Sequence, residues 1–157
     1  MPPTLFFDMS KIDLNTVLFN RDDVLSVNPQ NYEMQQLDGI IWSNKDAGEI
    51  LGFKDVTDKE FWVRGHIPGR PLMPGVIMVE AAAQLSSFYV KKIVGIEGFV
   101  GFAGIEEAKF RQTVVPGQRL LLLGKLLKYN PRRFSFGVQG IVDGAMVFEV
   151  VVSGMKI

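Results

Sequence analysis

Residues 66–84 read HIPGRPLMPGVIMVEAAAQ, and the rest of the chain is organised around this stretch. Its first ten residues hold three prolines, two glycines and His66, the only histidine of the protein. Each proline fixes a backbone angle and removes an N–H donor, whereas glycine admits conformations that other residues avoid. Good helix formers follow directly. The stretch therefore predicts a stiff loop that delivers His66 to the start of a helix.

The helix that follows this loop should be the one long helix of the chain. It can run from Gly75 to about Val94, because Gly95 then supplies a C-terminal stop. A helix of about twenty residues spans about 30 Å. Apolar side chains lie around the whole circumference of its first turns, which is typical of a buried helix. We therefore expect this helix at the centre of the fold.

After the helix the hydrophobic period changes to two, which is typical of strands. Asp143-Gly144 between two β-branched runs predicts a type I′ hairpin, so the last strands should be antiparallel. One buried helix with a run of antiparallel strands is an α+β pattern, in which a curved sheet wraps the helix. No linker or repeat divides the chain, and we expect one domain over residues 1–157. The expected strands are Phe99–Ala103, Glu107–Val115, Arg119–Lys128, Arg133–Val142 and Ala145–Lys156.

Two capping boxes lie upstream of the loop. Ser10 to Asp13 resembles one and predicts a short helix that ends near Asn20. Thr57 to Glu60 is the second and predicts a helical turn that carries Phe61 and Trp62 towards the core. Between the boxes the sequence predicts a polar loop over residues 21–30, strands over residues 32–42 and 49–56, and a turn over residues 44–48.

The composition excludes several classes of function. The 157 residues include 17 basic and 17 acidic side chains, so there is no net charge to attract nucleic acid or an anionic membrane. The absence of cysteine excludes disulfides, thiol catalysis and thiolate metal sites, and fits a reducing compartment. The first ten residues lack the pattern of a signal peptide, and no apolar run reaches about 18 residues. We expect a cytoplasmic protein that does not insert into membranes.

Four residues of the central stretch can do chemistry together. Glu80 lies among valines and alanines, which favour the protonated form of a carboxyl group and make it a candidate general acid. Gln84 lies one turn further along the same helix face and can orient Glu80. His66 is a candidate base, and the unpaired N–H of Gly75 at the helix start can polarise a carbonyl oxygen. This set suits abstraction of a proton next to a carbonyl, combined with loss or gain of a neighbouring hydroxyl.

Structural roles compete with these catalytic ones. A single histidine is more often a loop or core side chain, and a helical glutamate is usually solvated. For Glu80 the alternative is a structural role as a hydrogen-bonding group at a subunit interface. A phosphate-binding loop is not indicated, because the chain has neither Gly-x-Gly-x-x-Gly nor Gly-Lys-Ser/Thr. One histidine without cysteine also gives no expectation of a metal site.

The same stretch resembles the FabZ-type 3-hydroxyacyl-acyl-carrier-protein dehydratases of the hotdog fold. Their hallmark is His-Phe-Pro-Gly-x-Pro-hydrophobic-x-Pro-Gly-Val-hydrophobic-x-x-Glu-Ala-x-Ala-Gln, and residues 66–84 match it with Ile67 in place of the aromatic residue. The similarity continues through FAGIEEAKF at residues 102–110 and VVPG at residues 114–117. It therefore covers the chain from about Thr57 to the C-terminus.

The resemblance implies a hotdog fold and dehydration of (3R)-hydroxyacyl thioesters to trans-2-enoyl thioesters, in fatty acid biosynthesis or a related acyl pathway. It implies that His66 abstracts the C2 proton, that Glu80 helps the C3 hydroxyl leave as water, and that the Gly75 amide holds the thioester oxygen. In this family the histidine and glutamate of one site come from two subunits of a dimer, and dimers often assemble into hexamers as trimers of dimers. No metal or organic cofactor is needed. The acyl chain arrives on the phosphopantetheine arm of acyl carrier protein, which is acidic.

The N-terminal third departs from the family pattern. Where the family has Pro-His-Arg-aromatic-Pro-Phe-Leu, two hydrophobic residues and Asp-Arg, residues 29–39 read PQNYEMQQLDG. Pro29, Tyr32 and Asp38 are retained, whereas the histidine and both arginines are absent. Gln35 and Gln36 stand where apolar residues would line a core or an acyl tunnel.

Contacts with the carrier protein and two rival functions complete the expectations. Lys109, Arg111, Arg132 and Arg133 flank strands and are candidate contacts for an acidic carrier protein, although isolated surface cations are usually just solvated. A thioesterase on the same scaffold is one rival, since a buried carboxylate and a helix-start amide also serve attack by water. The other is a module that binds acyl chains or carrier protein without efficient chemistry.

Overall fold

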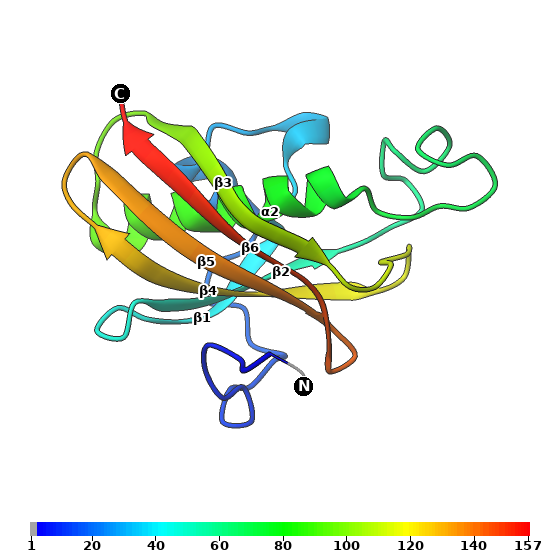
Figure 1. Cartoon of the computed structure of the whole chain (residues 1–157), viewed down its shortest axis with the longest axis horizontal. Coiled ribbons are helices and arrows are strands. Elements are labelled where there is room, and N and C mark those ends of the chain that lie inside the picture. The colour runs from blue at the N-terminus through cyan, green and yellow to red at the C-terminus, as the bar shows by residue number, and fades with distance from the viewer. Residues whose placement is uncertain (1–2) are drawn as a thin grey trace.

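A six-stranded antiparallel sheet curls around one long helix in the computed structural model, which describes residues 3–157 (Figure 1). The strand order is β1-β2-β4-β5-β6-β3, and all five neighbouring pairs are antiparallel. This confirms the predicted curved sheet around a central helix. The strands are β1 Gly39–Asn44, β2 Glu49–Asp55, β3 Val100–Phe110, β4 Arg119–Tyr129, β5 Arg133–Val142 and β6 Ala145–Lys156.

The central helix α2 spans Gly75–Phe88 and continues as a π-helix over Tyr89–Val94. Gly95 ends it in the left-handed conformation, with a φ of 96°, as the sequence predicts. Leu85 and Phe88 are completely buried against the concave face of the sheet. The helix is not buried all round, however, because Val76 in its first turn is 74% exposed. The prediction that this helix is buried on all sides is therefore wrong for its first turn.

Strand β4 shows why the sheet is stable in its middle. Its leucines alternate between the two faces, so that Leu120 and Leu122 join the core around α2 while Leu121 and Leu123 join a second cluster on the outer face. The N-terminal segment covers that outer face with Phe6, Phe7, Met9 and Ile12 (Figure 1). Gln139 of β5 fixes this segment, since its Oε1 accepts from Phe6 N–H (2.9 Å) and its Nε2 donates to Thr4 O (2.9 Å).

The predicted helix between Ser10 and Asn20 is wrong, and so is the loop that was expected after it. Residues 10–18 form turns, bends and irregular structure, Phe19 bridges Ile40, and helix α1 spans Arg21–Val27 instead. Asn20 is its N-cap: its Oδ1 accepts from Asp23 N–H (3.0 Å), and Asp23 Oδ2 accepts from Asn20 N–H (2.9 Å). In contrast, Asp13 accepts a hydrogen bond from Asn15 N–H within a turn. The helix therefore begins after Asn20, where both reciprocal capping bonds form, and not after Ser10.

Three other expected strands need correction. Of the strand expected over residues 32–42, only β1 forms, while Tyr32–Met34 is a short 3-10 helix. The two strands expected at residues 99–103 and 107–115 are one strand, β3, which bulges between Glu106 and Lys109. Glu107 has a φ of 52° at this bulge, which explains the broken period in the sequence.

Two predicted turns can be compared directly with the structure. At Thr57 only half of the capping box forms, because Glu60 Oε2 accepts from Thr57 N–H (3.0 Å) but no helix follows. Trp62 is buried there while Phe61 is half exposed. Asp143 and Gly144 both have positive φ, 48° and 79°, and form the predicted hairpin turn between β5 and β6.

No helix among residues 3–157 is long and apolar enough to cross a membrane.

Candidate active site

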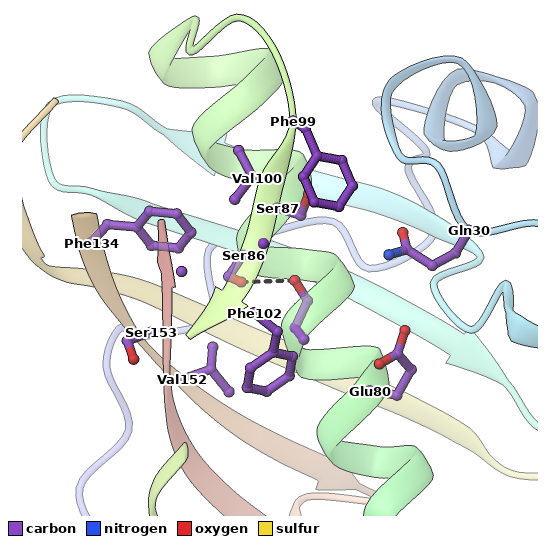
Figure 2. A pocket seen from close by; sticks show the side chains of 13 residues that line it. Gln30, Glu80, Ser86, Ser87, Phe99, Val100, Phe102, Phe134, Val152 and Ser153 are labelled. Atoms are coloured by element: carbon purple, nitrogen blue, oxygen red, sulfur yellow. Dashed lines mark hydrogen bonds between the residues drawn. The ribbon is translucent and has the colours of Figure 1, made fainter. Parts of the chain in front are cut away.

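A pocket of about 240 Å³ lies between α2 and the first half of β3, with β5 and β6 behind it (Figure 2). Glu80 belongs to its wall, together with Ala83 and Ser87 of the same helix face. These residues are spaced three and four apart, so the α-helix brings them to one side. Phe134 and Val152 form an apolar wall on the sheet. The pocket thus combines one carboxyl group with space lined by hydrocarbon.

The surroundings of Glu80 are more polar than the sequence predicts. Glu80 is half-buried, and the pocket around it also receives the side chains of Gln30 and Ser87. Gln84 Nε2 donates to Glu80 Oε1 at 2.8 Å, the contact that their spacing predicts. The carboxyl group therefore lies among polar as well as apolar side chains.

Gln84 is the centre of a buried hydrogen-bond network. It is 1% exposed, and besides Glu80 its Nε2 binds Met34 O at 2.6 Å. Its Oε1 accepts from the backbone N–H groups of Gln36 (2.8 Å) and Leu37 (3.1 Å). One side chain therefore holds the Glu80 carboxyl and the segment 34–37 together. This satisfies all of its hydrogen-bonding groups, as burial requires.

The unusual glutamines of segment 29–39 do not line the Glu80 pocket. Gln35 and Gln36 are both buried, at 4% and 1% exposed. Gln36 Nε2 donates to Glu33 O (2.8 Å), and Gln35 borders a separate polar groove on the other side of the segment. Their side chains therefore do not add polarity to the pocket that contains Glu80.

The polar groove beside Gln35 contains a buried ion-pair network that the sequence did not reveal. Lys54 Nζ lies 3.0 Å from Glu60 Oε1 and 3.9 Å from Asp38 Oδ2. Asp38 also accepts a hydrogen bond from Asp55 N–H (2.8 Å). Burial raises the pKa of Asp38 although Lys54 opposes the shift. The network ties the start of β1 to β2 and to the loop that leads to His66.

His66 lies on the loop that projects beyond the N-terminal end of α2 (Figure 1). Its backbone N–H donates to Trp62 O (2.9 Å), and its ring Nδ1 lies 3.0 Å from Leu72 O. A carbonyl partner selects the tautomer with hydrogen on Nδ1, which leaves Nε2 with a free electron pair. The ring is exposed, and the residues that line the Glu80 pocket within residues 3–157 do not include His66. One chain therefore does not bring these two residues into one pocket.

Gly75 is the first residue of α2, and Pro74 before it offers no side-chain cap. Within residues 3–157 its N–H has no hydrogen-bond acceptor, because the first N–H groups of a helix lack intrahelical partners. A Cβ at this position would lie 2.9 Å from Phe110 Cε1, so the approach of β3 favours glycine. The Gly75 N–H is thus available to an external oxygen, as the sequence predicts.

Strand β3 is an edge of the sheet and carries exposed apolar side chains. Phe102, Ile105 and Phe110 are between 49% and 55% exposed. An edge strand with unpaired backbone groups and apolar side chains is suited to pair with another chain. This edge borders the Glu80 pocket, since residues 100–102 line it.

The four basic candidates for carrier-protein contacts differ in their partners. Arg111 Nε donates to Glu149 Oε2 at 3.1 Å, so its charge is already paired. Lys109, Arg132 and Arg133 are exposed, and none of them forms an ion pair within the described part of the chain. The structure thus separates one paired cation from three that are available to an acidic partner.

Gln30 is the residue of this site that sequence reasoning missed. In the sequence it appeared only as a departure from the family pattern. A polar residue after a proline in a loop does not reveal which way its side chain points. The pocket becomes visible only once the loop after α1 is placed against α2.

Comparison with known proteins defines the family. Residues 28–151 match the model of the FabA-like domain, and the chain belongs to this family. It is 35% identical over 141 residues to the "3-hydroxyacyl-[acyl-carrier-protein] dehydratase FabZ" of Lawsonia intracellularis (strain PHE/MN1-00), covering 85% of this chain and 90% of that protein. It is 38% identical over 134 residues to the protein of the same name from Brucella abortus (strain S19), covering 84% and 85%.

Solved structures show the hotdog fold that was predicted. The dehydratase heterocomplex ApeI:P from Xenorhabdus doucetiae matches with a TM-score of 0.70 at 15% identity, covering 85% of this chain and 90% of that chain. A hypothetical thioesterase protein with coenzyme A from Streptococcus pneumoniae TIGR4 matches with a TM-score of 0.62 at 10% identity, covering 85% and 94%. At such identities the likeness establishes the fold alone.

Proposed function

We propose that this chain dehydrates (3R)-hydroxyacyl thioesters carried by acyl carrier protein to the trans-2-enoyl products, in fatty acid biosynthesis or a related acyl pathway. One observation carries the proposal: the Glu80 carboxyl lies in a pocket with an apolar wall and is held there by Gln84. The relatives named 3-hydroxyacyl-[acyl-carrier-protein] dehydratase, at 35% and 38% identity over most of the chain, support the same reaction. Thioester hydrolysis has no comparable support.

We further propose that the active site is shared between two subunits of a homodimer. His66 is exposed and does not line the Glu80 pocket of its own chain, among the residues described. The β3 edge beside that pocket is unpaired and apolar, so a second copy pairing there would cover it. In this arrangement His66 and Gly75 of one subunit meet Glu80 of the other. Assembly of three such dimers into a hexamer is the larger state that we propose.

The geometry divides the reaction among the three groups. The Leu72 carbonyl holds hydrogen on Nδ1 of His66, so Nε2 takes the proton from C2 of the substrate. The Gly75 N–H donates to the thioester oxygen, where negative charge builds as C2 loses its proton. Glu80 gives its proton to the C3 hydroxyl, and water leaves as the C2–C3 double bond forms. Gln84 keeps the Glu80 carboxyl aimed into the pocket.

The carrier protein is the partner that delivers the acyl chain on its phosphopantetheine arm. Lys109, Arg132 and Arg133 are exposed cations that can attract its acidic surface, whereas Arg111 is partly neutralised by Glu149. Neither a metal nor an organic cofactor has a part in this reaction scheme. The single domain over residues 1–157 and the cytoplasmic location stay predictions.

The reaction can be tested with purified protein and a (3R)-hydroxyacyl thioester, by following the absorbance of the enoyl product. The wild type should form enoyl thioester, and His66→Ala and Glu80→Ala should not. Absence of enoyl product at high enzyme concentration, while a known dehydratase forms it, would contradict the proposal. Release of free thiol without enoyl product would instead indicate a thioesterase. Tight acyl binding that His66→Ala leaves unchanged, without turnover, would indicate a binding module.

A further inference from the structure

A side-chain amide without a protein partner faces the same pocket as Glu80. Gln30 lies in the loop after α1, and its Oε1 is buried without a hydrogen bond. Within residues 3–157 its Nε2 forms no hydrogen bond either, but this atom is accessible and not buried. Figure 2 shows the amide extended into the pocket from the side on which Glu80 lies, with its nitrogen leading. The cost of burial without a partner falls on Oε1, whereas the accessible Nε2 can donate to a ligand in the pocket.

Other buried polar atoms lack partners too, but they lie elsewhere. They belong to Asn28, Gln35, Gln36 and Trp62, and none of these four residues lines the pocket that contains Glu80. Among these residues, Gln30 alone lines the pocket that contains the Glu80 carboxyl group. A ligand in this pocket would therefore be the natural partner for its amide.

Hydrogen bonds of neighbouring residues hold the loop that carries Gln30. On one side, Asn28 Nδ2 donates to the backbone oxygen of Gln84 at 2.9 Å. On the other, Asn31 Oδ1 accepts from Tyr32 N–H at 2.8 Å and starts the 3-10 helix. Since Gln84 also holds the Glu80 carboxyl, the same residue sets both sides of the gap between Gln30 and Glu80. Gln84 therefore holds both the loop that carries Gln30 and the Glu80 carboxyl, and both residues line one pocket.

We propose that Gln30 is a further catalytic residue, whose Nε2–H donates a hydrogen bond to the C3 hydroxyl of the substrate and assists its departure. This inference rests on the dehydration proposed above. As the C3–O bond breaks, its electron pair moves to the oxygen, and negative charge develops there. A donor aimed at that oxygen is worth more in the transition state than in the ground state.

The step is balanced without any further reactant. His66 of the partner subunit takes the C2 proton, and the electron pair of the C2–H bond becomes the C2–C3 double bond. The C3–O electron pair goes to the leaving oxygen, and the proton of the Glu80 carboxyl completes the water molecule. Gln30 neither gains nor loses a proton, so it orients the hydroxyl and stabilises its charge. The proton later returns from His66 to Glu80 through solvent.

Gln30→Met tests the role, because methionine is similar in length and cannot form this hydrogen bond. Removing one such donor should lower kcat/KM for the 3-hydroxyacyl thioester about 10- to 100-fold. The same variant should change the inhibition constant of the saturated acyl thioester, which lacks the C3 hydroxyl, by less than about twofold. Gln30→His restores a ring N–H donor and should recover part of the lost activity.

Gln112→Met is the control for the substitution itself. Gln112 is an exposed glutamine that does not line the pocket. The activity of this variant should stay within about twofold of wild type. Wild-type turnover by Gln30→Met would overturn the inference. An equal loss of turnover and of inhibitor binding would overturn it as well, because such a loss indicates structural damage. If the wild type itself forms no enoyl product, the proposed dehydration fails instead.

Discussion

The side chain of Gln84 joins the Glu80 carboxylate to the segment that precedes β1. Its Nε2 donates to Glu80 Oε1 at 2.8 Å, while its Oε1 accepts hydrogen bonds from the backbone N–H groups of Gln36 and Leu37. The position of the candidate acid therefore depends on a segment that lies almost fifty positions earlier in the sequence. This relationship makes Gln84 both a structural residue and a positioning residue.

Gln84→Leu should destabilise the protein by about 2–4 kcal/mol, because it leaves several buried backbone and side-chain groups without partners. It should also lower kcat, since Glu80 loses its orienting bond. Urea unfolding and the enoyl assay measure the two effects. Gln112→Leu, at an exposed position, should change the free energy of unfolding by no more than about 0.5 kcal/mol. Equal effects of the two variants would contradict the proposed network.

Substitution by alanine should lower the free energy of unfolding by different amounts at two glycines that face aromatic rings. A Cβ on Gly140 would overlap the ring of Phe148, which is completely buried, so overpacking should cost about 1–3 kcal/mol. A Cβ on Gly75 would meet Phe110, which is half exposed and can move aside, so the cost should stay below about 1 kcal/mol. Chemical denaturation of Gly140→Ala and Gly75→Ala measures the difference. A larger loss for Gly75→Ala would contradict the packing described for β3.

Asp38 should give the stability a specific dependence on pH. Its pKa is raised above the ordinary value of 3.8 by burial, so the folded state binds its proton more tightly than the unfolded state does. The contribution is present below the ordinary pKa and is lost as pH rises through the raised pKa. Asp38→Asn should therefore remove a fall in the free energy of unfolding that begins near pH 4. Urea unfolding at several pH values tests this, and parallel curves for both proteins would contradict it.

The β3 edge should control the oligomeric state. Ile105→Glu puts a charge on the exposed apolar edge and should convert dimers to monomers, with loss of turnover because the site needs both subunits. Leu127→Glu is the matched control, since Leu127 is 45% exposed on β4, away from this edge. Light scattering and the enoyl assay measure both properties. A monomeric Ile105→Glu protein with full activity would show that the site lies within one chain.

The central part of the fold could be predicted because local patterns agreed with the tertiary structure. The glycine and proline loop before α2, the stop at Gly95 and the Asp143-Gly144 turn each depend on backbone preferences of a few residues. The helix near Ser10 was a wrong prediction because two similar capping patterns compete, and only Asn20 and Asp23 form both reciprocal bonds. In β3 a bulge at Glu107 breaks the two-residue hydrophobic period, and no residue type at this point of the sequence indicates a bulge.

The candidate site was predictable only in part, for a physical reason. The contact between Glu80 and Gln84 follows from helix geometry, so spacing was enough. The approach of Gln30 to the same pocket depends on how a distant loop packs against α2, and no short-range pattern contains that information. The exposed ring of His66, apart from the Glu80 pocket, agrees with a site completed by a second chain, as the family resemblance implies.

Mixing two inactive variants tests the shared site most directly. His66→Ala and Glu80→Ala, each inactive alone, should regain turnover when they are co-expressed and form mixed dimers. In a mixed dimer one site combines the intact His66 of one chain with the intact Glu80 of the other, and the second site lacks both. Random pairing should then give about a quarter of the wild-type activity per chain. If the mixed dimers form but show no more activity than either variant alone, the site is not shared between subunits.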